Sequence, residues 1–180
     1  MKYRIKNKLG NFIHLLPPII WMWLIFTLSS QPYSQQDIRP LLKSKIPETV
    51  LKERLAGIEV KYAGNEISIQ AKGVPGFIEF FIRKGAHVFV FMMLAVLIQW
   101  AVQKTWLIGI WSYGITFLLT FLYAISDEWH QSFNPNRTSR VEDIGIDTLG
   151  IIIGIMIMMI VNRVIKHTKT KGSAPDSVKV

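Results

Sequence analysis

The sequence predicts an all-α membrane protein with four transmembrane helices and a small extracytoplasmic insertion, made of an amphipathic helix and a β-hairpin. Half of the 180 residues are hydrophobic and only 18% are charged. Four apolar stretches reach the roughly 17–25 residues that span a bilayer. The net charge of +9 on so apolar a chain indicates a membrane rather than nucleic acid as the partner. The sequence contains no cysteine, which excludes disulfides, Cys-ligated zinc and thiol catalysis.

The four predicted spans comprise about residues 12–28, 86–102, 106–126 and 144–161. Tryptophans lie near the ends of several stretches, where aromatic belts form. The first stretch follows a basic segment, as a signal peptide does, but we expect it to remain as an anchor. We predict that the basic segment 1–11 and a disordered basic tail, 163–180, are both cytoplasmic, because lysine and arginine favour that side.

The long segment between the first two spans, residues 31–84, is predicted to fold outside the membrane. Apolar residues between positions 38 and 58 recur at helical spacing, and Pro40 and Pro47 divide them into a short and a longer helix. Apolar and polar residues alternate at 58–62 and again at 67–71, on either side of turn-forming residues, which predicts a β-hairpin. An apolar run at 77–82 then leads into the second span.

Polar and charged side chains gather at span ends that the topology places on one side of the membrane, the outer one. They belong to the start of the second span, the end of the third, the following loop and the start of the fourth: Arg83, Lys84 and His87; Asp127, Glu128, His130 and Gln131; Arg137 and Arg140; and Asp143 and Asp147. This convergence is the strongest indication of a functional site in the sequence.

Helical spacing refines this set of residues. Arg83 and His87 are four residues apart and share a helix face. Asp147 lies about one turn inside the fourth span, where an unpaired carboxylate is costly, so we expect Arg83 or Arg137 as its partner. Gly150 and Gly154 form a G-x-x-x-G pattern, which permits close approach of another helix.

Three kinds of site fit these residues. We favour a binding cradle in which Arg83, Lys84 and Arg137 hold an anionic head group, because charges of both signs are mixed as in a paired network. An acid–base site with Glu128 or His130 as the base is an alternative. Two histidines and nearby carboxylates also suit a divalent metal, but no H-E-x-x-H motif occurs, and we predict neither a metal nor a cofactor. In a purely structural protein, the same residues would only lock the helices together.

A family resemblance rests on these same residues. The stretch SDEWHQSFNPNR at 126–137 resembles the hallmark of the VanZ-like family of bacterial membrane proteins. The RKGAH sequence at 83–87, the SSQP sequence at 29–32, and Asp143 with Asp147 and Gly150 are also similar to that family. The resemblance covers roughly residues 12–162. The family pattern often continues past the histidine with Glu-Tyr, whereas Val90 and Phe91 stand here.

The resemblance implies a multi-pass protein of the bacterial cytoplasmic membrane that acts at the cell envelope. The founding member is linked to teicoplanin resistance in Gram-positive bacteria, so glycopeptide resistance is one expectation. The expected partners are membrane lipid and an anionic lipid head group or lipid-linked cell-wall precursor, and not nucleic acid. A membrane-embedded hydrolase or transferase acting on a lipid-linked substrate is the alternative function.

Overall fold

The computed structural model describes residues 13–104, 109–134 and 140–172, with side chains up to position 168. Four of its helices are long and apolar enough to cross a membrane, and the described residues contain one two-stranded hairpin. The predicted fold class is therefore confirmed, and the chain is a multi-pass membrane protein. The predicted cytoplasmic segment 1–11, the end of the predicted tail and Arg137 lie outside the described residues.

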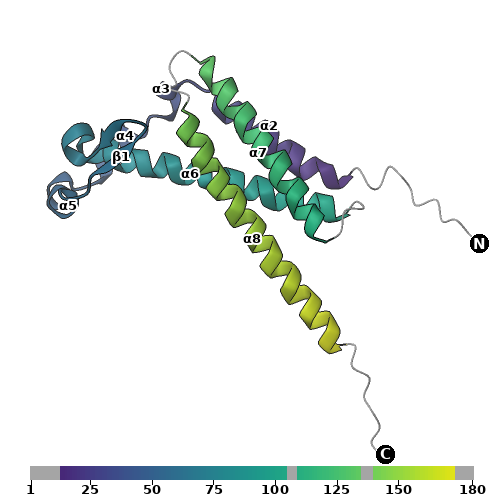
Figure 1. Cartoon of the computed structure of the whole chain (residues 1–180). Helices are drawn as coiled ribbons and strands as arrows, with labels where there is room; N and C mark the ends of the chain where they lie inside the picture. Colours follow the sequence, from purple (N-terminus) through teal and green to yellow (C-terminus); the bar gives the residue numbers. More distant parts are fainter. Residues whose placement is uncertain (1–12, 105–108, 135–139, 173–180) are drawn as a thin grey trace, which may run out of the picture.

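The first candidate span comprises a short 3-10 helix, η1 (Ile13–Leu15), and helix α2 (Leu16–Ser30). Two prolines occupy the first turn of α2, where a missing backbone N–H is tolerated. The other spans lie within α6 (Ile69–Lys104), α7 (Ile110–Ser132) and α8 (Val141–Gly172). The C-terminal ends of α2 and α7 and the N-terminal end of α8 lie at one end of the bundle (Figure 1).

The insertion between α2 and α6 projects from this end of the bundle (Figure 1). It contains three short helices and a hairpin: α3 (Tyr33–Gln36), α4 (Arg39–Lys45), α5 (Glu48–Leu55), β1 (Val60–Tyr62) and β2 (Asn65–Ile67). Ala63 and Gly64 connect the strands, both with positive φ (50° and 74°), as a tight two-residue hairpin turn requires. Ile67, Val74 and Phe77 form a small core that joins the insertion to the first part of α6.

Two predicted boundaries were wrong. Helix α6 begins at Ile69, so residues 69–71 are helical and do not extend the second strand. Ser68 Oγ accepts the backbone N–H of Ala71 at 3.1 Å, which caps the first turn, and Gly73 (φ +67°) then kinks the helix. Helix α8 continues to Gly172, so residues 163–172 are not part of a disordered tail, because Val164 and Ile165 extend its helix-forming sequence.

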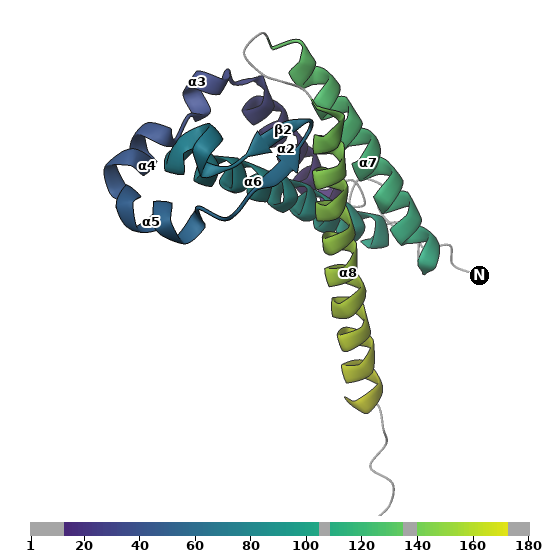
Figure 2. The ribbon, with the colours of Figure 1, turned by 60° about the vertical axis from the view of Figure 1, so that its left-hand side comes forward.

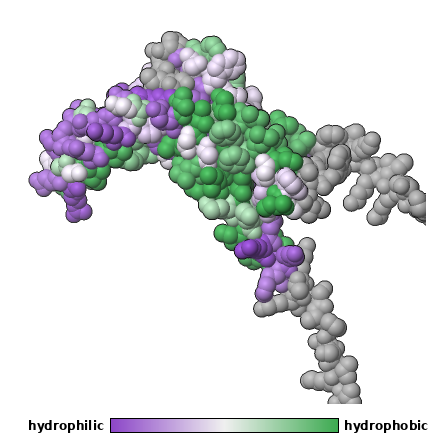
Figure 3. Space-filling view, in the orientation of Figure 1, coloured by the Kyte–Doolittle hydropathy of each residue, from purple (hydrophilic) through white to green (hydrophobic). Residues whose placement is uncertain are grey.

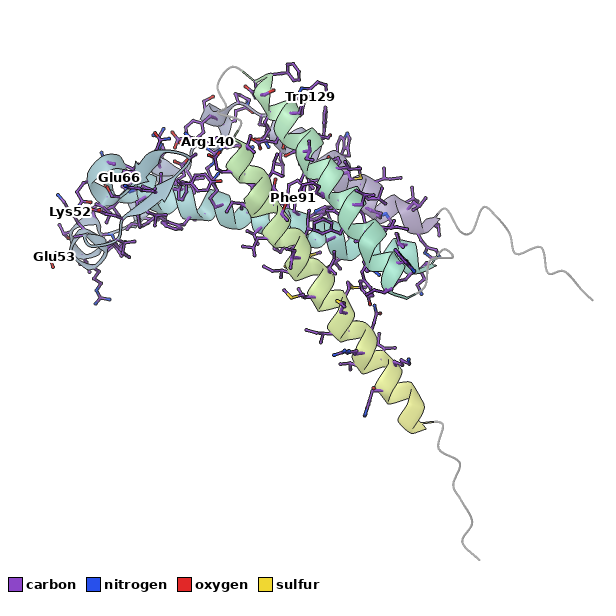
Figure 4. The ribbon with its side chains drawn as sticks, in the orientation of Figure 1. Lys52, Glu53, Glu66, Phe91, Trp129 and Arg140 are labelled. Carbon is purple, nitrogen blue, oxygen red and sulfur yellow. The ribbon has the colours of Figure 1, made fainter. Side chains whose placement is uncertain are left out.

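The bundle has a separate core centred on α6. Phe91, Leu94 and Ala95 of α6 are completely buried, together with Ala124 of α7 and Ile151 of α8; Figure 4 shows Phe91 between the crossing helices. On the face that Figure 3 shows, hydrophobic side chains cover most of the bundle, whereas mostly hydrophilic ones cover the insertion and the far end of α8. Such an extended apolar surface on a small chain indicates contact with lipid.

Glycines allow α8 to lie against α6. A Cβ atom added to Gly150 would lie 2.3 Å from the carbonyl oxygen of Val88, and one added to Gly154 would lie 2.4 Å from that of Met92. Side chains at these positions would force the two backbones apart. This close approach sets the axial position of α8, and therefore of Asp143 and Asp147, along α6.

Buried polar side chains also join the end of α6 to the start of α7, and sequence analysis did not identify them. The Gln99 side chain donates to Ser112 Oγ at 2.9 Å and accepts from Thr116 Oγ1 at 2.7 Å. All three side chains are completely buried. Buried polar groups satisfied in this way hold helices together in an apolar environment.

Candidate functional site

A cavity of about 490 Å³ lies where the insertion meets the bundle, within the range typical of small-molecule sites. Its walls come from α3, the hairpin, the first half of α6, the end of α7 and the start of α8. Six of the residues that the sequence analysis brought together line it: Arg83, Lys84, His87, Gln131, Arg140 and Asp143. The structure thus brings together side chains from three spans, as the topology led us to expect.

The hairpin is fastened to α8 through Asp143. The Tyr62 hydroxyl donates to Asp143 Oδ1, and Lys84 Nζ forms an ion pair with the same oxygen. The Lys84 ammonium also lies 4.6 Å from the centre of the Tyr62 ring, a favourable cation–π distance. Burial and the hydrogen bond to Asp143 raise the pKa of Tyr62 well above its usual range. Figure 2 shows the resulting contact, with the hairpin beside the first turns of α8.

His87 and Asp147 form a second link between α6 and α8. His87 Nδ1 lies 3.1 Å from Asp147 Oδ1, and Asp147 is completely buried. The other carboxylate oxygen of Asp147, Oδ2, has no hydrogen-bond partner in the part of the chain that the structure describes. The expectation that Arg83 neutralises Asp147 was wrong, because Arg83 lies one turn further out along α6. Arg137, the other expected partner, lies outside the described residues.

Arg83 instead faces the insertion. Its guanidinium carbon lies 4.8 Å from the centre of the Tyr33 ring. The Tyr33 hydroxyl donates to Glu79 Oε2 at 2.8 Å, and Arg39 Nε lies 3.6 Å from the same oxygen. Burial and the contact with Glu79 raise the pKa of Tyr33. Aromatic stacking orients Arg83 without neutralising its charge.

Three basic side chains of the cavity have no ion-pair partner among the residues that the structure describes. Lys72, Arg83 and Arg140 line it, yet none of them forms an ion pair with another described residue. Arg140 Nη1 donates a long hydrogen bond, of 3.4 Å, to the carbonyl oxygen of Ala63. Lys84 differs from these three because Asp143 neutralises it. The cavity therefore offers positive charge to a ligand.

The polar side chains near the C-terminal end of α7 form hydrogen bonds with each other, with α2 and with the start of α8. Asp127 accepts a hydrogen bond from Gln131 at 2.7 Å, and Gln131 also reaches Ser29 Oγ of α2 at 3.4 Å. Glu128 accepts the backbone N–H of Arg140, which fixes the start of α8. All of these α7 side chains are buried.

His130 does not face the cavity. Its ring stacks on Phe26 of α2 with a centroid distance of 4.4 Å, and it belongs to neither described cavity wall. Glu128, the other candidate base, also lies outside both walls. Neither candidate catalytic residue is therefore part of the cavity wall, although Glu128 contacts Arg140, which is, and His87 is the histidine that lines the cavity.

A second cavity, of about 280 Å³, lies between α2 and α6. Its walls are mostly apolar and include Ile25, Leu28, Ala86, Val90 and Phe91. Arg83 and His87 line this cavity as well as the first. The two cavities therefore meet at these two side chains.

Sequence analysis missed several wall residues, namely Tyr33, Tyr62, Lys72 and Glu79. Glu79 stands alone in the apolar run 77–82 and is only 4% exposed. A lone carboxylate in such a run is itself a signal of a polar site, and we overlooked it. The tyrosines gave no comparable signal, because tyrosine is common wherever a membrane protein meets water.

Comparison with known protein families identifies the family of this chain. The model of the VanZ/LLP1 family matches residues 6–162, most of the chain. The chain belongs to the VanZ/LLP1 family. The match includes all four candidate spans up to Asn162 and the whole insertion, which agrees with the resemblance seen in the sequence motifs. Searches of the curated proteins and of the solved structures found no match. The cavity is thus a feature of a VanZ/LLP1 membrane domain.

Proposed function

We propose that this VanZ/LLP1-family protein binds the anionic head group of a membrane lipid or of a lipid-linked cell-wall precursor. The observation that carries the proposal is the set of three basic cavity residues without an ion-pair partner in the described chain, Lys72, Arg83 and Arg140. Arginine suits phosphate and carboxylate groups because its planar fork donates two parallel hydrogen bonds.

The position of the cavity supports the same function. It lies at one end of the apolar bundle, beside the hydrophilic insertion. A lipid whose chains remain in the bilayer places its head group at that depth. The wall carries four basic side chains, Lys72, Arg83, Lys84 and Arg140, against the two carboxylates of Glu79 and Asp143. An anion in the cavity therefore meets net attraction.

Binding can be tested with purified protein in neutral detergent. We expect native mass spectrometry to detect phosphatidylglycerol more readily than phosphatidylcholine. Arg83→Gln should weaken phosphatidylglycerol retention by about tenfold, the equivalent of one lost charge-assisted hydrogen bond. Lys52→Gln is the matched control, because Lys52 lies at the far tip of the insertion (Figure 4). Equal retention by the two variants would refute the proposal.

We also propose that the cavity faces outward from a bacterial cytoplasmic membrane, with both chain ends cytoplasmic. The basic residues beside both ends support this orientation. The cysteine-free sequence permits a direct test. Glu53→Cys in the insertion should react with an impermeant thiol reagent in whole cells, whereas Lys104→Cys at the end of α6 should react only after lysis. The opposite pattern would reverse the orientation.

Lipid hydrolysis or head-group transfer is a second candidate, favoured by the His87–Asp147 pair at the cavity wall. A carboxylate that orients a histidine can make it a general base. Phosphatidylglycerol labelled in its head group should then lose the label in vesicles that contain the protein. His87→Gln should abolish the loss. The absence of turnover by the wild-type protein would leave binding as the function.

Glycopeptide resistance belongs to the same proposal, as one consequence of occupying an envelope lipid. Expression of the wild-type protein should raise the teicoplanin concentration that inhibits a susceptible host, and Arg83→Gln should lose this effect. Equal protection by both proteins would separate resistance from the anion site.

A further inference from the structure

The two cavities that meet at Arg83 and His87 differ in chemistry. The larger is lined largely by charged and polar groups, whereas the surface that lines the smaller is mostly apolar, although Ser29, Gln31, Gln36 and Asp127 also border it. A ligand that fills both must be polar at one end and apolar at the other. We infer that the smaller cavity holds the first segment of an apolar chain, attached to the anionic head group in the larger one. This inference rests on the proposed function, and it defines the ligand class as a single-chain anionic amphiphile or one chain of a lipid.

The wall of the smaller cavity is suited to a hydrocarbon chain. Ile25 and Phe91 form buried parts of the wall, 3% and 0% exposed. Leu28 and Ala86 also line it but reach the molecular surface, and Leu28 is 40% exposed. The cavity therefore opens towards the bilayer between α2 and α6, so a chain can continue from it into lipid.

The polar residues of this wall do not require a ligand, because they bond to one another or to backbone. Gln36 donates to the carbonyl oxygen of Leu28 at 2.7 Å and to Gln31 at 3.3 Å. Asp127 accepts from Gln131 at 2.7 Å. With these groups satisfied, the remaining wall offers apolar contact, which a methylene chain matches and a second head group does not.

The size of the cavity limits the occupant to one chain. At about 280 Å³ it has little more than half the volume of the polar cavity, and α2 and α6 enclose it on two sides. Arg83 and His87 would flank the bond that joins the head group to the chain. In lipids that bond belongs to a phosphate ester or acyl ester, both of which accept hydrogen bonds from such side chains.

The test compares ligands with and without a chain. We expect lysophosphatidylglycerol, which has one chain, to bind the detergent-solubilised protein at least about tenfold more tightly than glycerol phosphate, because burying a few methylene groups contributes that much. Ala86→Trp fills the apolar cavity and should remove this advantage while leaving glycerol phosphate binding unchanged. Phe89→Trp is the control, because Phe89 is 52% exposed on the same helix and lies outside the wall.

The outcomes separate the inference from the proposed function. Equal affinity of the wild-type protein for the two probes, or full lysophosphatidylglycerol affinity in Ala86→Trp, would overturn the inference and leave head-group binding intact. Failure of both probes to bind the wild-type protein would overturn both. If Ala86→Trp impairs folding, Leu28→Trp fills the opposite wall. Loss of both probes from folded Leu28→Trp would also overturn the inference, because the chain site should not affect the free head group.

Discussion

Replacement of Gly150 by alanine should disrupt both the packing of α8 and the site that depends on it. The new Cβ would lie 2.3 Å from Val88 O and 3.1 Å from Met92 N, against an ordinary contact distance of at least 3.4 Å. Since both neighbours are backbone atoms of α6, no side-chain rotation relieves the overlap. The helices must separate by about 1 Å.

This displacement reaches His87 and Asp147, because Asp147 lies one turn before Gly150 on the same helix. A separation of their 3.1 Å contact by such an amount breaks the hydrogen bond. Overpacking costs about 1–3 kcal/mol, the lost bond to a charged group about 1.5–3 kcal/mol, and the better helix propensity of alanine returns about 1 kcal/mol. We expect a net loss of about 1.5–5 kcal/mol in the free energy of unfolding.

Unfolding in a detergent titration measures this loss, and Gly145→Ala supplies the control. Gly145 lies on the same helix, but an added Cβ there meets nothing within 4 Å, so alanine should be neutral or stabilising by up to about 1 kcal/mol. A Gly150→Ala protein as stable as the wild type would refute close packing at this position. Equal destabilisation by both substitutions would show that helix α8 is sensitive to alanine for another reason.

Three further changes test other contacts. Gln99→Leu should destabilise the bundle by about 0.5–2 kcal/mol in the same titration, because it removes the hydrogen bonds that join α6 to α7. Lys84→Met should cost about 1.5–3 kcal/mol in the same titration, because it leaves the buried Asp143 carboxylate without its ammonium partner. The pKa of Tyr62 is raised from an ordinary value of 10, so its neutral form stabilises the fold fully below pH 10, and this contribution is lost as the pH rises through the folded value. Stability of Tyr62→Phe should therefore fall less steeply above pH 10, as measured by chemical unfolding across the alkaline range.

Local patterns in the sequence predicted the elements of this fold well. Apolar length identified four spans, because stretches of this length and hydropathy are typical of helices that cross a bilayer. The alternation around Ala63 and Gly64 identified the hairpin. The same alternation misassigned Ile69 to a strand, because so short an apolar–polar pattern fits one turn of helix as well as a strand. In the structure, the N-terminal cap at Ser68 starts the helix there.

The pairing of site residues was harder to predict, because it depends on how helices rotate and slide against each other. Spacing along α6 placed Arg83 and His87 on one face but did not indicate which of them reaches Asp147. The close contact at Gly150 sets that offset. The position of His130 was hard to predict for a similar reason, since the last turns of α7 direct its ring towards Phe26 of α2.

The long sequence separation within the site determines when it can form during synthesis. Lys84 and His87 enter the membrane region well before their partners, Asp143 and Asp147, which lie about 60 residues later in the chain. Because chains emerge from the ribosome N-terminus first, Lys84 and His87 lack these two carboxylate partners until α8 is inserted. In a nascent chain arrested before residue 141, Lys84 and His87 would remain unpaired with these carboxylates. Quality-control proteases or insertion chaperones would encounter the chain in that state.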